Sequence, residues 1–394
     1  MLRRHLRAAA AGAGARAGGW GPRCRVWTRP ASGVPCRPPM RDVLCMRLSG
    51  ALPASGEAAA GAAGVDATVF GSEEESERWR QFARQASGEW EGVIAVFDDE
   101  GKAQPLPPHY VPDAFREWGV EVCDWQEQCS MLADASAGTL HFRVRRMMPT
   151  VGCEADAVAF EEESTLLWQR DGGGADGAAV RTVLQDGSYL AAPATLPTDA
   201  KSAHVEVCLA LPADSGGRRR ARIAAALVRD WQTKAWKAAR YEVAHERFEC
   251  EYRGGGQDLQ LLGCHGAQTI SDLPPVSAAA AGNEKWSVAA GNAFVLKRTA
   301  ASAGGSGDGG DGAPRKLAAG EAPPALSGTA TTTHMPMGLF GRVTVPQDNA
   351  DAFYLQVGFA AAGLDVRRVA HIVYRSNELT GFAVTDESAA NDSA

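Results

Sequence analysis

The feature that most constrains the fold is an alternation of apolar and polar residues with a period of two, repeated over many short segments. The clearest cases lie near the end of the chain, at residues 339–345, 353–359, 367–376 and 380–385. Successive side chains of a β-strand point to opposite faces, so each segment is predicted as a strand. Many short strands separated by turns predict an all-β fold, an antiparallel barrel or sandwich.

The first strand is predicted to follow a short helix. Ser72-Glu73-Glu74-Glu75 has the form of a capping box, and Trp79, Phe82 and Ala86 follow at helical spacing. The helix is expected to end near Gly88. The pentapeptide Gly88-Glu89-Trp90-Glu91-Gly92 then opens a strand that a turn at 98–101 closes.

Residues 218–253 allow two interpretations. Ile223, Leu227 and Trp231 recur every four residues, which is typical of a helix. From Tyr241 onward the apolar residues alternate instead, and their phase reverses at Arg247. We favour two strands, the second with a bulge at Arg247.

The N-terminal segment differs in composition from the rest of the chain. Residues 1–47 contain ten Arg, no Lys and the single acid Asp42, which is typical of an organelle transit peptide. A basic arm that binds nucleic acid is the alternative. Residues 48–71 are rich in Ala, Gly and Ser and are predicted to form a disordered linker.

Charge and hydropathy exclude several classes of partner. The whole chain has a net charge of −7 and the leader contributes +9, so residues 48–394 stand at −16. An acidic protein of this kind is not expected to bind nucleic acid or an anionic membrane surface. No apolar run approaches 18 residues, so no transmembrane segment is predicted.

Several segments carry a resemblance to a known family. Gly88, Trp90 and Gly92 form the lipocalin-type opening of a barrel, placed just after a short helix. Further matching segments are Leu106-Pro107-Pro108-His109-Tyr110-Val111-Pro112, Asp124-Trp125-Gln126-x-Gln128-Cys129, and Met148-Pro149-Thr150-Val151-Gly152-Cys153-Glu154-Ala155-Asp156-Ala157. With these, the chain resembles an uncharacterised calycin-like (lipocalin-like) family of plant, algal and cyanobacterial proteins.

This resemblance implies a domain organisation and a subcellular location. It implies two calycin-like β-barrels in tandem, at 72–256 and 257–388, the second carrying a disordered Gly-rich insertion at 299–330. It also implies a plastid location, which we expect to be the chloroplast stroma, with the mitochondrial matrix as the alternative. It implies no established activity.

Trp90 is expected to plug the closed end of the first barrel. In calycins a late Arg often covers the ring of this Trp, and Arg247 or Arg253 is the candidate here. The alternative is a Trp that stacks on a ligand.

A ligand cavity is the second expectation for the first barrel. Phe142, Val144 and Met147 could line an apolar cavity, which an eight-stranded barrel is just wide enough to enclose. The alternative is a core filled by these side chains. Cys153 could lie near a linear tetrapyrrole, because related cyanobacterial calycins handle such pigments, or be a small buried residue.

No motif identifies a reaction, a metal or a nucleotide cofactor. The eight His lack metal spacing, and His245 and His371 are expected to be satisfied in strands. Arg218-Arg219-Arg220 is expected at an exposed turn that could meet a ligand carboxylate. We therefore expect a non-catalytic protein that binds an apolar or tetrapyrrole-like small molecule. The alternatives are a pigment-attachment or pigment–protein assembly factor, and a structural assembly protein with a filled barrel.

Overall fold

A computed structural model describes most of the chain beyond the predicted linker. The described residues are 73–151, 160–168, 179–214, 217–255, 270, 286–295, 315–360 and 366–389. The predicted transit peptide 1–47, the linker 48–71 and Cys153 lie outside them. Among the described residues, no helix combines the length and apolar character needed to cross a membrane.

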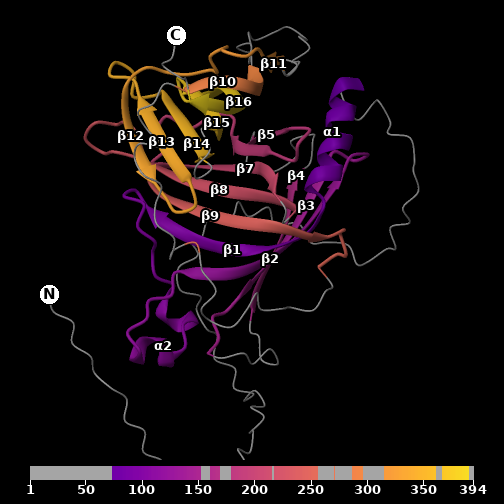
Figure 1. Cartoon of the computed structure of the whole chain (residues 1–394). Coiled ribbons are helices and arrows are strands. Elements are labelled where there is room, and N and C mark those ends of the chain that lie inside the picture. The colour runs from indigo at the N-terminus through magenta and orange to yellow at the C-terminus, as the bar shows by residue number, and fades with distance from the viewer. Residues whose placement is uncertain are drawn as a thin grey trace, which may run out of the picture. The chain divides into compact units, whose positions relative to one another are not determined.

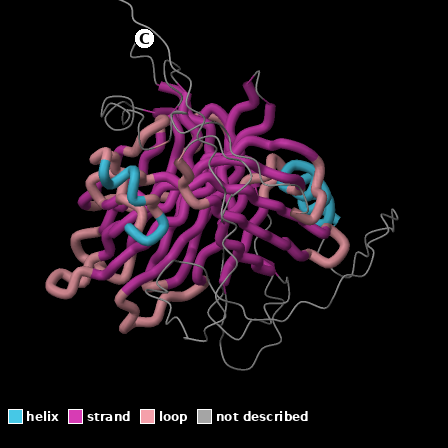
Figure 2. Tube along the Cα trace, turned by 90° about the horizontal axis from the view of Figure 1, so that it is seen from below, coloured by secondary structure: helices cyan, strands magenta, loops and turns pink. Residues whose placement is uncertain are grey.

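Antiparallel strands dominate the described chain, and helical turns lie at its periphery (Figure 2). The helices are α1 (Glu73–Ala86), the 3-10 turn η1 (Pro108–Tyr110) and α2 (Asp113–Glu117). The first sheet contains β1 (Gly88–Asp98), β2 (Asp124–Asp134), β3 (Thr139–Met147), β4 (Phe160–Trp168), β5 (Ala179–Val183), β6 (Tyr189–Pro193), β7 (Ser202–Asp214), β8 (Gly217–Arg229) and β9 (Trp236–Cys250). The second contains β10 (Trp286–Val295), β11 (Arg315–Leu317), β12 (Thr329–His334), β13 (Leu339–Val345), β14 (Phe353–Ala360), β15 (Val366–Arg375) and β16 (Glu378–Ala389).

Both sheets share one topology. In the first, the order is β4-β3-β2-β1-β9-β8-β7-β6-β5, so consecutive strands are neighbours and the first strand pairs with the last (Figure 1). In the second, β10 likewise pairs with β16, and the order is β11-β10-β16-β15-β14-β13-β12. Pairing of first and last strands is how an up-and-down meander curls toward a barrel. The predicted all-β, antiparallel barrel-type fold with few helices is confirmed.

In each sheet, one pair of consecutive strands lies at opposite ends of the strand order, so the barrel is not closed by hydrogen bonds among the described residues. No ladder joins β4 to β5 in the first sheet, or β11 to β12 in the second, within the part of the chain that the structure describes. The two sheets use separate stretches of chain, but one apolar cluster joins them. The tandem division at residues 256 and 257 stays a prediction.

The apolar cluster between the sheets has a simple origin in the sequence. The odd-numbered residues in the middle of β8, from 221 to 227, are apolar and buried, and they belong to the same cluster as Leu355 of β14 and Phe382 of β16. These β8 residues are Ala221, Ile223, Ala225 and Leu227. The Trp236 and Phe353 rings join the two sheets directly, with their centroids 5.5 Å apart.

The helix α1 covers one end of the first sheet (Figure 1). Trp79, Phe82 and Ala86 are buried, as their spacing predicts, and Phe82 meets the Tyr189 ring edge-on at 6.4 Å. Three acids in its first turn and Arg84 in its last suit the helix dipole.

The two-strand interpretation of residues 218–253 is confirmed by β8 and β9, but the predicted bulge at Arg247 is wrong. The register of β9 against β1 is continuous from Arg240 to Phe248, and the extra residue is Glu249. The reversal of phase has another cause, because β9 is buried on both faces. Tyr241 and Val243 face the second sheet, whereas Glu246 faces the interior of the first.

The disorder predicted for 299–330 needs correction at its end. Residues 299–314 lie outside the described residues, but Arg315–Leu317 form β11 against β10. Pro324 packs within about 3 Å of where a Cβ on Gly381 would lie, so this part of the chain also covers β16. Low sequence complexity therefore did not prevent this end of the segment from packing on the sheet.

Candidate functional site

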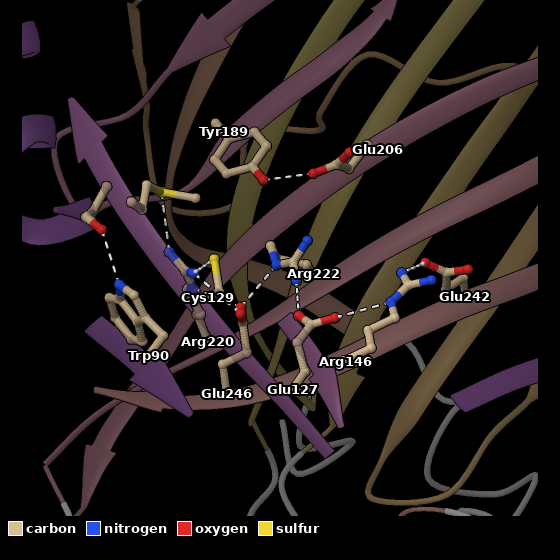
Figure 3. A network of polar contacts seen from close by, with 12 residues as sticks. Trp90, Glu127, Cys129, Arg146, Tyr189, Glu206, Arg220, Arg222, Glu242 and Glu246 are labelled. Atoms are coloured by element: carbon tan, nitrogen blue, oxygen red, sulfur yellow. Dashed lines mark hydrogen bonds and ion pairs between the residues drawn. The ribbon is translucent and has the colours of Figure 1, made fainter. Parts of the chain in front are cut away.

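The interior face of the first sheet carries a buried ionic network. Arg220 and Arg222, both on β8, donate through Nε to one carboxylate oxygen of Glu246 on β9, at 2.7 and 2.9 Å (Figure 3). Arg220 is 2% exposed and Glu246 is 0% exposed. A single buried carboxylate therefore holds two guanidinium groups, which cross-link neighbouring strands.

The network continues across the interior to β2 and β3. Arg222 also pairs with Glu127 on β2, and Arg146 on β3 lies between Glu127 and Glu242, at 3.5 and 2.8 Å. Figure 3 shows these side chains converging from β2, β3, β8 and β9. The two halves of the meander are thus joined by charge pairs as well as by the β1–β9 ladder.

The two central carboxylates respond differently to this environment. Burial by itself raises the pKa of Glu246, but the positive charges of Arg220 and Arg222 outweigh it and lower the pKa to about 2. Burial raises the pKa of Glu127, and the charge of Arg222 offsets this only in part. Glu246 is therefore the carboxylate of the network that stays negatively charged.

The thiols of this interior are held protonated. Cys129 Sγ lies 3.2 Å from Arg220 Nη2, yet burial raises the pKa of Cys129 well above its ordinary value. Burial also raises the pKa of Cys208 to about 12. Because the thiolate is the nucleophile, these cysteines are suited to packing rather than to covalent chemistry.

Trp90 lies beneath α1 and is covered by a different arginine from the ones predicted. Its indole Nε1 donates to the carbonyl of Ala86 at 3.0 Å, and the guanidinium of Arg220 lies 4.0 Å from its ring centroid. Arg247 instead has a 55% exposed side chain and lies 3.7 Å from Glu91. The predicted partners Arg247 and Arg253 are therefore wrong, because the strand that crosses the ring is β8.

The two glycines of the opening allow close approach of β9 to β1. A Cβ on Gly92 would lie 2.1 Å from the carbonyl oxygen of His245. Gly88 has a φ of 144°, and a Cβ there would lie 2.4 Å from the Phe248 ring. The signature thus serves the pairing of first and last strands.

The residues proposed to line an apolar cavity do not form one wall. Phe142 and Val144 are buried in the interior cluster with Trp90 and Met131, and the Arg222 guanidinium lies 4.7 Å from the Phe142 ring. Met147 is buried, but the regular alternation of β3 places it on the opposite face from Val144. Cys153 lies outside the described residues.

A pocket of about 200 Å³ opens at the α1 end of this interior. The end of α1, the loop before β6, the β7–β8 hairpin and one strand of the second sheet all contribute to it. Its lining is Gln85, Ala86, Trp90, Asp186, Gly187, Ala210, Leu211, Arg218, Arg219, Arg220 and Arg368. Arg218-Arg219-Arg220 was predicted to lie at an exposed turn. This prediction is wrong, because Arg218 and Arg219 are half-buried and Arg220 is buried. A run of arginines that continues into an alternating strand is the signal that could have indicated an inward-facing charge.

The second sheet holds a separate buried polar cluster. His371 lies 2.5 Å from the Tyr354 hydroxyl through Nδ1, and its Nε2 lies 2.7 Å from Thr385 Oγ1 and 3.2 Å from Glu387. Burial lowers the pKa of His371 even though Glu387 raises it. His371 is thus a satisfied core residue, as expected. Among the described residues, no three His, Cys, Asp or Glu side chains group closely enough to hold a metal.

Comparison with known proteins gives little guidance. No family model matches the chain, and no curated protein matches it. One solved structure, a protein of unknown function from the DUF3598 family of Nostoc punctiforme, is 12% identical with a TM-score of 0.44, over 79% of this chain and 99% of that one. An acyl-CoA thioesterase II from Mycobacterium marinum is 11% identical with a TM-score of 0.10, over 49% of this chain and 81% of its own. Likenesses at these scores carry no argument about fold or activity.

Proposed function

We propose that the protein is a non-catalytic calycin-type binding protein of the chloroplast stroma that holds a small molecule at the α1 end of its first sheet. The observation that carries the proposal is the pocket of about 200 Å³ beside Trp90. The Arg-rich composition of residues 1–47 supports the proposed location in an organelle.

The interior of the first sheet supports binding at its end rather than in its centre. The centre is occupied by Phe142, Met131 and the Arg220–Glu246–Arg222 network, all of which pack on one another. A ligand there would have to displace ion pairs that are already satisfied. The pocket is smaller than the roughly 300–1,000 Å³ of sites that enclose drug-sized ligands, so a large pigment would not fit within it.

The test is native mass spectrometry of the protein purified from chloroplasts. We expect a bound small molecule that is lost when Ala210→Trp fills the pocket. Ala330→Trp, at an exposed position of β12, is the matched control and should retain it. If the wild-type protein carries nothing, or if Ala210→Trp retains the molecule while folded, the proposal fails.

A structural assembly role is the second candidate, because the filled interior needs no ligand. Trp231, in the β8–β9 turn, is 75% exposed and Trp118, after α2, is 61% exposed, as is common at protein interfaces. A stoichiometric partner that co-purifies with the wild-type chain and is lost with Trp231→Ser would favour this role. A monomer without a partner would count against it.

A further inference from the structure

One face of the second sheet points away from the first sheet, and we call it the far face. A Cβ on Gly341 of β13 would lie 2.2 Å from Cζ of Tyr241 on β9, so the odd-numbered residues of β13 face the first sheet. The side chain of Arg342 therefore lies on the far face. Most side chains of this face are buried, among them Phe340, Tyr354, Val369 and His371.

A polar row on the far face is only half-buried. Thr332 of β12, Arg342 of β13 and Gln356 of β14 are directly opposite one another in the two ladders. Figure 1 shows these three strands side by side. Directly opposed residues of antiparallel strands have Cβ atoms about 4.5–5.5 Å apart, so the Thr332 hydroxyl and the Gln356 amide flank the Arg342 side chain.

The polar atoms of this row lack the partners that the rest of the face has. Arg342 Nε is buried and donates to no acceptor, and Arg342 forms no ion pair within the chain that the structure describes. His334 Nδ1, on the same face of β12, is also buried without a hydrogen-bond partner. His371, opposite Gln356 on β15, is by contrast satisfied through both of its ring nitrogens.

The positive charge of Arg342 is not balanced by its own strands, because β12, β13 and β14 contain no Asp or Glu. Glu387 of β16 lies on the far face, but it already accepts from Arg367 at 2.7 Å. Burial lowers the pKa of Arg367, Glu387 opposes this, and the positive charge of Arg342 lowers it further. An anion beside Arg342 would reduce this repulsion and give the buried Nε an acceptor.

We infer that Arg342, flanked by Gln356 and Thr332, binds an oxyanion, a carboxylate or phosphate group of a small molecule, on the far face of the second sheet. A guanidinium group pairs with two oxygens at once, and a neighbouring amide and hydroxyl donate to those that remain. The site is separate from the pocket beside Trp90, whose lining contains none of these residues. It does not depend on the proposed function.

The experiment is calorimetric titration of the full chain with inorganic phosphate and, separately, with succinate, at constant ionic strength. We expect saturable binding of at least one probe, and the probe that binds identifies the oxyanion. Arg342→Gln should weaken that binding about tenfold or more, because charge-assisted hydrogen bonds are lost.

A second variant tests the same site by filling it. Gln356→Glu places a carboxylate directly opposite Arg342, where it should form an ion pair and abolish binding of the probe while the protein stays folded. Arg375→Gln removes an exposed charge from the same sheet and is the control, which should bind as the wild type does. Ala210→Trp, which fills the pocket beside Trp90, should also leave this binding unchanged.

Two outcomes would overturn the inference. One is the absence of saturable binding of either probe up to about 10 mM, a range in which even a weak site fills. The other is binding that Arg342→Gln and Gln356→Glu leave as strong as in the wild type, which would place the anion elsewhere. Binding that is lost only with Ala210→Trp would assign the anion to the pocket beside Trp90, so it would support the proposed function and remove the site at Arg342.

Discussion

The two faces of β8 are both buried, yet their chemistry is opposite. The face toward the second sheet carries Ala221, Ile223, Ala225 and Leu227 in a purely apolar cluster. The face toward the interior of the first sheet carries Arg220 and Arg222, which share the carboxylate of Glu246. Apolar packing tolerates repacking, whereas a buried charge needs its specific partner. The apolar face therefore mainly stabilises the fold, whereas the ionic face also determines the register of the strands.

The largest expected effect is on the ionic face. Glu246→Ala should lower the free energy of unfolding by about 3–5 kcal/mol, because two buried guanidinium groups lose their common anion. Urea denaturation measures it. Glu242→Ala, on the same strand but only partly buried, is the control and should cost much less. Equal losses for the two variants would contradict the central role of Glu246.

The apolar face should respond to loss of volume. Ile223 is fully buried between the sheets, so Ile223→Ala should cost about 2–5 kcal/mol through lost transfer free energy and a cavity. The same urea experiment applies. Ile223→Val removes less volume, so its free energy of unfolding should lie closer to that of the wild type than to that of Ile223→Ala. If the loss of stability does not increase with the volume deleted, the contrast between the two faces is wrong.

The pH dependence should distinguish the ionic face from the apolar one. The pKa of Glu246 is about 2 in the folded protein and near 4.5 in the unfolded chain, so the carboxylate contributes stability above pH 4.5 that is lost as the pH falls toward 2. The contribution at neutral pH is about 3 kcal/mol. Glu127 acts in the opposite direction, because its raised pKa gives stability that is lost as the pH rises through that pKa.

Unfolding free energies measured from pH 2 to pH 7 test this assignment. The acid limb should be steep in the wild type and flatter in Glu246→Gln, which lacks the titrating group. Ile223→Ala should shift the whole curve without changing its slope. An unchanged acid limb in Glu246→Gln would show that other carboxylates control the acid sensitivity.

The smallest expected effect concerns the contact between Trp90 and Arg220. Trp90→Phe keeps an aromatic ring beneath Arg220 but loses the hydrogen bond to Ala86, so we expect a cost of about 1–2 kcal/mol. Trp231→Phe, at an exposed turn, should change stability by less than about 0.5 kcal/mol. A cost equal to that of Glu246→Ala would mean that Trp90 anchors the network itself.

Sequence reasoning was strongest where the signal was local. The alternation at 339–345 and 353–359 predicted β13 and β14, and the spacing of Trp79, Phe82 and Ala86 predicted α1. It was weakest where two distant segments meet. The arginine over Trp90 comes from β8, about 130 residues away, and the pocket combines α1, the β7–β8 hairpin and Arg368 of the second sheet.

The sequence by itself determined that this chain forms many short strands, because side-chain alternation is a property of each segment alone. It also determined the short helix before the first strand and the acidic charge of everything after the leader. Only the tertiary structure decided that β1 pairs with β9, that both faces of β8 are buried, and that its arginines turn inward onto Glu246. The physical reason is that the alternation shows which residues share a face of a strand. Whether that face meets apolar side chains, a carboxylate or a pocket depends on strands that lie far away in the chain.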